Sequence, residues 1–143
     1  MDSGYTGAGG IYASVTATFQ YFLISGNTLT IVGAGTTTIN VTQNSSNNYN
    51  SASASMSLVV SKVIPSLTVS SSTINKTYGD APFSLSDFVS TNSPGVFSFL
   101  SSDLNVISIS GNMATIVGGG FATINVTVSS SSNYNGASKN INV

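Results

Sequence analysis

The chain contains one sequence pattern twice. Residues 24–58 and 109–143 align without a gap at an offset of 85, with 21 identical residues in 35 positions. Both copies carry the run Thr-Ile-Asn-Val-Thr, at 38–42 and again at 123–127. A period of this length is too long for one turn of a solenoid and suits a small β-sandwich domain. The repeat therefore predicts two related domains in tandem.

Hydrophobic and polar residues alternate within each copy. Leu29 and Ile31 are separated by threonine, and Ile39 and Val41 are separated by asparagine. Alternation of β-branched residues with period two is typical of strands that turn one face to a core and the other to solvent. No segment combines a helical period with a capping residue. We predict an all-β fold built from β-sandwich repeats.

The two copies differ in how much of a sandwich they contain. We predict an incomplete repeat over residues 1–61 and a complete repeat over residues 62–143. The first copy has no counterpart of residues 77–83, and about two strands' worth of sequence is missing before Ile24. A sandwich that lacks strands has an open edge and an uncovered core. Another segment must then fill the gap, unless residues 5–23 do so.

A specific set of motifs resembles a known repeat type. Thr77-Tyr78-Gly79-Asp80, then Ile109-Ser110-Gly111-Asn112, then Asn133-Tyr134-Asn135 is similar to the bacterial immunoglobulin-like tandem repeats that carry a Thr-Tyr-Gly-Asp turn. Such repeats occur in very large surface-anchored or secreted proteins of bacteria, and in some giant viruses. The resemblance covers residues 62–143 and the later two-thirds of the first copy. It implies a seven-stranded immunoglobulin-like sandwich, structural roles for Tyr78, Gly79 and Asp80, and no fixed ligand.

Charged side chains are unusually rare. The chain has 3 Lys and Arg residues together, 4 Asp and Glu residues together, and neither His nor Cys. Nothing of this composition can neutralise a run of phosphates, so we expect no nucleic-acid partner. No run of about 18 apolar residues occurs, so we expect no membrane insertion. Such a surface must depend on hydroxyls and amides, on attached sugars or on packing into an assembly. The resemblance to surface repeats implies an extracellular location, on a cell surface or a virion surface.

The composition also argues against catalysis. A Ser nucleophile needs a general base, and His, Cys and Glu are all missing. The carboxylates Asp80, Asp87 and Asp103 all belong to the second copy, so the repeat does not preserve them. Asp80 could bind calcium, but a lone carboxylate is more typical of a residue that bonds its own turn. We predict that the protein is not an enzyme and that it holds no cofactor and no metal.

A tyrosine flanked by asparagines recurs at Tyr49 and Tyr134. One interpretation is a sugar-stacking site, and the other, which we favour, is a side chain that plugs one end of the sandwich. We also predict that the alternating aliphatic residues pack in the core. The predicted packing residues are Ile31, Ile39, Val41, Tyr49, Ile116, Ile124, Val126 and Tyr134.

Four asparagines match the acceptor pattern for N-glycosylation, in which a Ser or Thr follows two positions later. They are Asn40, Asn44, Asn75 and Asn125. Alternation predicts that Asn40 and Asn125 lie on a solvent-facing side of a strand, where a glycan would fit.

Three functions remain open at this point. The chain could be a subunit of a surface fibre or filament, completed by a strand that a neighbouring copy donates. It could be a stalk or spacer in a long cell-surface adhesin, or a carbohydrate-binding module of one. The expected partners are copies of itself or adjacent repeats, with glycans as a further candidate.

Overall fold

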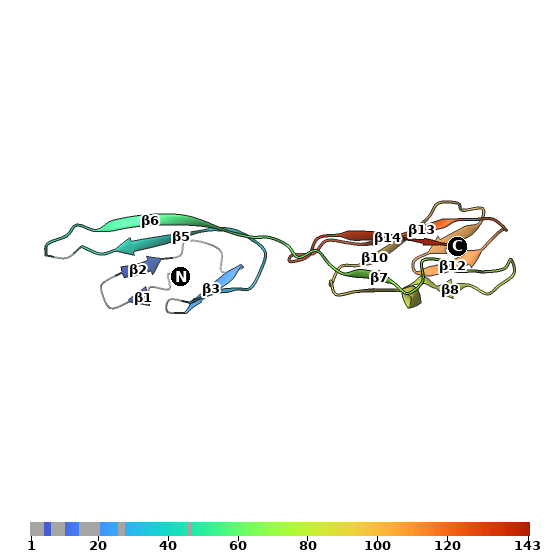
Figure 1. Cartoon of the computed structure of the whole chain (residues 1–143), viewed down its shortest axis with the longest axis horizontal. Coiled ribbons are helices and arrows are strands. Elements are labelled where there is room, and N and C mark those ends of the chain that lie inside the picture. The colour runs from blue at the N-terminus through green and yellow to red at the C-terminus, as the bar shows by residue number, and fades with distance from the viewer. Residues whose placement is uncertain (1–4, 7–10, 15–20, 26–27, 46) are drawn as a thin grey trace. The chain divides into compact units, whose positions relative to one another are not determined.

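A computed structural model describes residues 5–6, 11–14, 21–25, 28–45 and 47–143. The chain divides into two compact units, Met1–Lys62 and Val63–Val143, called here the first unit and the second unit (Figure 1). Every regular element that the described residues form is a β-strand, apart from one short 3₁₀ turn. All of the strand pairs within the sheets are antiparallel, which is consistent with a β-sandwich. The prediction of an all-β fold is confirmed.

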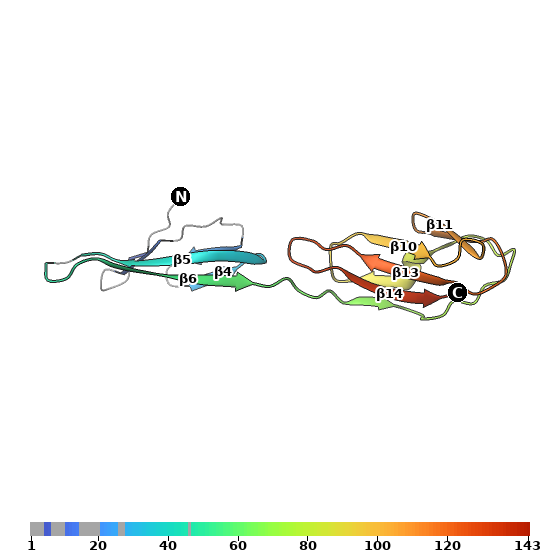
Figure 2. The ribbon, with the colours of Figure 1, turned by 90° about the horizontal axis from the view of Figure 1, so that it is seen from above.

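The second unit has three groups of paired strands. One sheet has the order β10-β13-β14, and its strands lie side by side in Figure 2. The remaining strands pair in the orders β11-β12-β8 and β7-β9. The strands of this unit are β7 (Leu67–Val69), β8 (Phe83–Ser84), β9 (Val89–Thr91), β10 (Phe97–Ser101), β11 (Ile107–Ser110), β12 (Met113–Ile116), β13 (Thr123–Val128) and β14 (Ala137–Asn142).

A 3₁₀ turn interrupts one strand of the second unit. The turn η1 (Leu85–Phe88) directly joins β8 to β9, so these three elements run on without a loop between them. Through β8 this stretch pairs with β12, and through β9 it pairs with β7. The groups β11-β12-β8 and β7-β9 are therefore joined by one broken strand into a single layer. The side chain of Leu85, at the start of the turn, is fully buried.

The core of the second unit follows the alternation seen in the sequence. On β13 the side chains of Ile124, Val126 and Val128 are fully buried, whereas Asn125 between them is exposed. Ile124 lies opposite Ile141 of β14 in the register of the sheet. Each such buried aliphatic side chain contributes about 1.5–3 kcal/mol to stability. The packing predicted for Ile124 and Val126 is confirmed.

The first unit repeats four strands of the second at the offset of 85. Its longest strands, β5 and β6, form a pair in Figure 1 and occupy the places of β13 and β14. The pair β3-β4 corresponds to β11-β12 in the same way. The strands of this unit are β1 (Tyr5–Thr6), β2 (Ile11–Ser14), β3 (Phe22–Ser25), β4 (Thr28–Ile31), β5 (Gly35–Gln43) and β6 (Ala52–Val60).

Strand β2 supplies a further counterpart that the repeat alignment does not reach. Its first residue, Ile11, lies opposite Gln43, just as Phe97 of β10 lies opposite Val128 at the equivalent repeat position. Residues 11–14 thus take the place of β10 beside β5. Among the described residues of the first unit, no strand takes the place of β7, β8 or β9.

Candidate functional site

The first unit carries an exposed apolar face at the position where the second unit has its core. Ile141 is 0% exposed, whereas Met56, at the same repeat position, is 59% exposed. Ile124 is likewise fully buried, and its counterpart Ile39, which lies opposite Met56, is only half-buried. We call the inward side chains of β5 and β6, with Ile39 and Met56 at their centre, the open face.

The difference arises from the strands that cover this face in the second unit. Leu67 of β7, Ile74 and Leu85 are buried in the same hydrophobic cluster as Ile141. These three residues belong to the stretch that has no described counterpart in the first unit. The alternation in β5 and β6 therefore sets which side chains point inward, but the layer that would bury them is not among the described residues.

The edges of the strands differ in the same way. In the second unit the backbone of Val63 bonds to Asn133 and Asn135, and further on the backbone of Asn142 bonds to residues 72 and 74. The segment of residues 63–74 thus runs beside β14, in parallel, with isolated bridges at Val63 and Thr73. Strand β6, the counterpart of β14, is an edge strand of its sheet among the described residues.

The second sheet of the first unit has a similar open edge. In the second unit, β12 pairs with β8 by placing Ala114 opposite Phe83, and the Leu85 N–H donates to the Asn112 carbonyl. In the first unit the described pairing of β4 is with β3 alone. In the described part of this unit, no strand pairs with β4 as β8 pairs with β12 in the second unit.

Thr37 is a buried polar residue among the inward side chains of β5. Its hydroxyl is buried and has no hydrogen-bond partner among the described residues. The residue at the same repeat position in the second unit is Ala122, which is also buried. A buried hydroxyl without a partner costs about 1–3 kcal/mol. Neither Thr37 nor Met56 was predicted from the sequence, although the offset of 85 pairs them with core residues.

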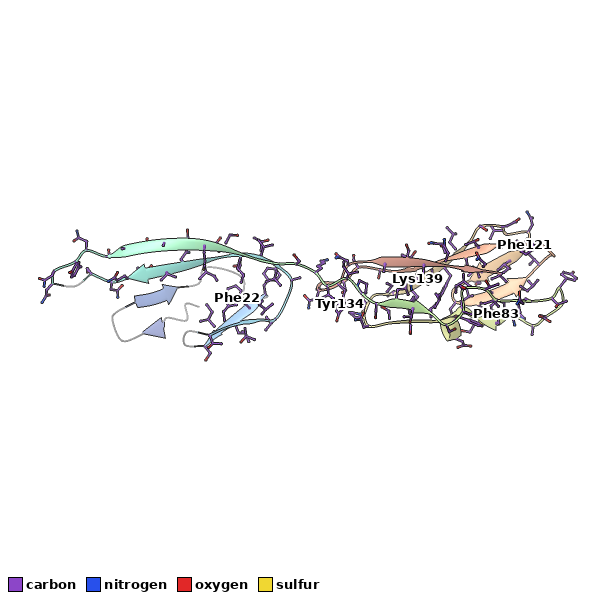
Figure 3. All side chains as sticks on the ribbon, in the orientation of Figure 1. Phe22, Phe83, Phe121, Tyr134 and Lys139 are labelled. Carbon is purple, nitrogen blue, oxygen red and sulfur yellow. The ribbon has the colours of Figure 1, made fainter. Side chains whose placement is uncertain are left out.

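The two tyrosines at equivalent repeat positions differ in the structure. Tyr134 is half-buried at the end of the second unit where Val63 enters (Figure 3), and a parallel bridge joins their backbones. Tyr49 is 73% exposed. The packing predicted for Tyr49 is wrong, and so is that of Ile31, which is also largely exposed. Tyr49 lies between β5 and β6, and no described segment of the first unit bridges to it as Val63 bridges to Tyr134.

The Thr-Tyr-Gly-Asp turn is held by its aspartate. The Thr77 N–H donates to the Asp80 carboxylate at 2.9 Å, and the Asp80 N–H donates to the Thr77 carbonyl at 3.0 Å. Gly79 has a φ of 98°, a conformation that side-chain-bearing residues rarely adopt. Tyr78 is exposed. The structure thus gives Asp80 the contact with its own turn that we expected.

The candidate glycosylation sites fall in two environments. Asn44 and Asn75 are exposed outside the strands, at the end of β5 and in the stretch before the turn at Thr77. Asn40 is half-buried within β5. Asn125 is exposed on β13, but its amide nitrogen donates to the Asn140 side chain at 2.8 Å, and Thr127 donates to its amide oxygen at 3.1 Å.

The carboxylates of the second unit lie in separate local structures. The Asp103 carboxylate accepts a hydrogen bond from the Asn105 N–H at 2.8 Å, and Asp87 belongs to η1. Within the described ranges, no three His, Cys, Asp or Glu residues come together as a metal site would require. The described residues also form no helix long and apolar enough to cross a membrane.

A second apolar feature lies at the opposite end of the second unit from Tyr134. Phe121 is 95% exposed there (Figure 3) and lines a depression of about 460 Å³ together with residues of β13 and β14. Its counterpart in the first unit is Thr36, so the repeat does not preserve this side chain.

Comparison with protein-family models, with curated proteins and with solved structures found no match to this chain. The candidate site therefore depends on the internal comparison of the two units. On the open face of the first unit, Met56 is exposed and Ile39 is half-buried, whereas their counterparts Ile141 and Ile124 are fully buried.

Proposed function

We propose that this chain is a non-catalytic, extracellular structural protein, built from immunoglobulin-like repeats and serving as a repeat segment or subunit of a surface fibre. The observation that carries the proposal is the repetition itself. Four strands recur in both units with the same pairing and register, as expected when a chain is extended by adding one domain after another.

The strand order supports the immunoglobulin-like part of the proposal. If β8 and β9 are counted as one strand, one sheet of the second unit contains the third, sixth and seventh strands. The other contains the fourth, fifth, second and first, in that order. This is the order expected of a constant-type immunoglobulin sandwich. The motif around Asp80 and the low charge support the resemblance to surface repeats.

The location and role can be tested on the source cells or particles. We expect a protease added to intact material to remove the chain, and antibodies against it to label surface fibres by electron microscopy. Lysed material and a known interior protein serve as controls. Protection of the chain until lysis would contradict the proposal.

The exposure of Tyr49 favours one alternative, a carbohydrate-binding module. An exposed aromatic ring flanked by the exposed amides of Asn48 and Asn50 offers a stacking surface beside hydrogen-bonding groups. A glycan array with the full chain and with Tyr49→Ala tests it. Binding that the substitution abolishes would support a lectin function, and silence of both proteins would argue against it.

A further inference from the structure

We propose that the open face of the first unit binds a two-stranded segment of another repeat, equivalent to residues 63–92 of the second unit. The inference rests on the proposed function as a tandem-repeat protein and names the partner of its incomplete unit. The incoming segment would add one strand beside β6 and another beside β4, and would cover Met56 between them.

The strands that accept this segment occur twice in the chain. In the second unit, β12, β13 and β14 receive the segment of residues 63–92, and β4, β5 and β6 are their counterparts at the offset of 85. The pairings Ile124 with Ile141 and Ile39 with Met56 are equivalent. A backbone that accepts this segment in one unit offers the same register in the other.

In the second unit, residues 63–92 make both apolar contacts and backbone hydrogen bonds. The segment buries apolar side chains at Leu67, Ile74 and Leu85, and it bonds to backbone groups of β14 and of Asn112. The Ser66 N–H also donates to the Asn92 side chain at 2.9 Å, which ties the start of the segment to its end. An occupant of the open face must likewise supply both alternating apolar side chains and backbone hydrogen bonds. A peptide strand meets both needs.

The donor must be a segment that is not already in use. If a second copy of this chain gave up its own residues 63–92, it would uncover Ile124, Ile141 and the rest of its buried cluster. The exchange would bury one face and expose an equivalent one, so it would bring no net stabilisation. We therefore assign the donor to a further repeat whose segment of this type is free.

The acceptor also indicates how the donor differs from residues 63–92. In the second unit the small, fully buried Ala114 lies opposite Phe83. The counterpart of Ala114 in the first unit is Leu29, and the counterpart of Ile107 is the larger, buried Phe22. Larger residues on the acceptor leave less room for the donor, because cores are close-packed. The matching donor therefore carries a residue smaller than Phe at the position of Phe83.

The test uses the full chain and a synthetic, fluorescein-labelled peptide of residues 63–92. Anisotropy measures binding, and hydrogen exchange locates it. The peptide is prepared as the native sequence, with Phe83→Val, and with Leu67→Asp. The chain is prepared as the native protein, with Met56→Asp, and with Ser55→Asp as the matched control, since adjacent residues of a strand face opposite sides.

We expect the Phe83→Val peptide to bind more tightly than the native peptide. Met56→Asp in the chain or Leu67→Asp in the peptide should weaken binding about tenfold or more, as expected when a buried apolar contact is lost. Ser55→Asp should change it less than about threefold. Protection from exchange should appear in residues 28–31 and 52–60. Because Met56 is largely exposed, its substitution leaves the fold intact, which circular dichroism checks.

Three results would overturn the inference: no binding by any peptide, binding that neither aspartate substitution weakens, or protection confined to the second unit. Self-association of the chain that Met56→Asp abolishes, without peptide binding, would assign the face to a second copy instead. The protease and antibody tests are independent of the peptide. A failed peptide with a surface-exposed chain refutes this inference alone, and a chain protected until lysis refutes the proposed function.

Discussion

Shortening the side chain at one repeat position in each unit should show that this face is covered in the second unit and open in the first. Ile141→Ala and Met56→Ala remove side chains that occupy equivalent places on β14 and β6, opposite Ile124 and Ile39. Ile141 is 0% exposed and belongs to the buried cluster of the second unit, whereas Met56 is 59% exposed. The open face therefore predicts a large loss of stability in one unit and a small loss in the other.

The magnitudes follow from burial. Ile141→Ala removes three buried carbon atoms, worth about 2.4 kcal/mol at about 0.8 kcal/mol each. The cavity left behind raises the cost to about 3–4 kcal/mol. Burying a whole Met side chain is worth about 1.5–3 kcal/mol, so the buried part of Met56 accounts for only about 1 kcal/mol. We expect the Ile141 substitution to destabilise its unit at least three times as much as the Met56 substitution does.

Native-state hydrogen exchange reads the two units separately, because the slowest amides of β13 and β5 report the unfolding of their own units. At about 1.4 kcal/mol per factor of ten, Ile141→Ala should speed exchange in β13 by about two to three powers of ten. Met56→Ala should speed exchange in β5 by about fivefold. Each unit is the internal control for the substitution in the other. Equal losses of stability would refute the reasoning, because Met56 would then be covered as fully as Ile141.

Three further predictions concern single positions. Thr37→Val replaces the buried hydroxyl with a methyl group, so the same assay should show the first unit gaining about 1 kcal/mol, and a loss would contradict this. Gly79→Ala should destabilise the second unit by about 1–2 kcal/mol. The cause should be backbone strain at a φ of 98°, because no atom lies within 4 Å of the added Cβ to clash with it. Gly119→Ala, equally free of neighbours, should cost less than about 0.5 kcal/mol, and equal costs would refute strain as the cause. In a glycosylating host, mass spectrometry should find more glycan at Asn75 than at Asn125. Asn75 lies in an exposed loop, whereas the Asn125 amide is hydrogen-bonded to the neighbouring strand. More glycan at Asn125 would contradict this prediction.

The sequence predicted the parts of the fold that local patterns determine. Alternation identified the β5 and β13 strands and the burial of Ile124, because the faces of a strand follow from a period of two. The contact of Asp80 with its own turn was also expected, since it joins residues only three positions apart.

The rest depends on partners that are distant in the sequence. Tyr49 and Tyr134 have the same flanking asparagines, yet only Tyr134 is half-buried, because its backbone meets Val63 from the start of the unit. The role of β2 was missed because the alignment of the two copies begins only at Ile24, after this strand. The 3₁₀ turn at Leu85 was missed because four residues are too few to show a helical period.

The parallel run of residues 63–74 beside β14 has a mechanical consequence. Two parallel neighbours enter and leave a domain at opposite ends, so tension on the two ends of the second unit pulls them past each other. The backbone hydrogen bonds at Val63 and around Asn142 are then loaded in shear and at the same time. Antiparallel terminal strands would instead peel apart one bond at a time. A domain with this arrangement resists force along the direction in which a fibre of tandem repeats would transmit it.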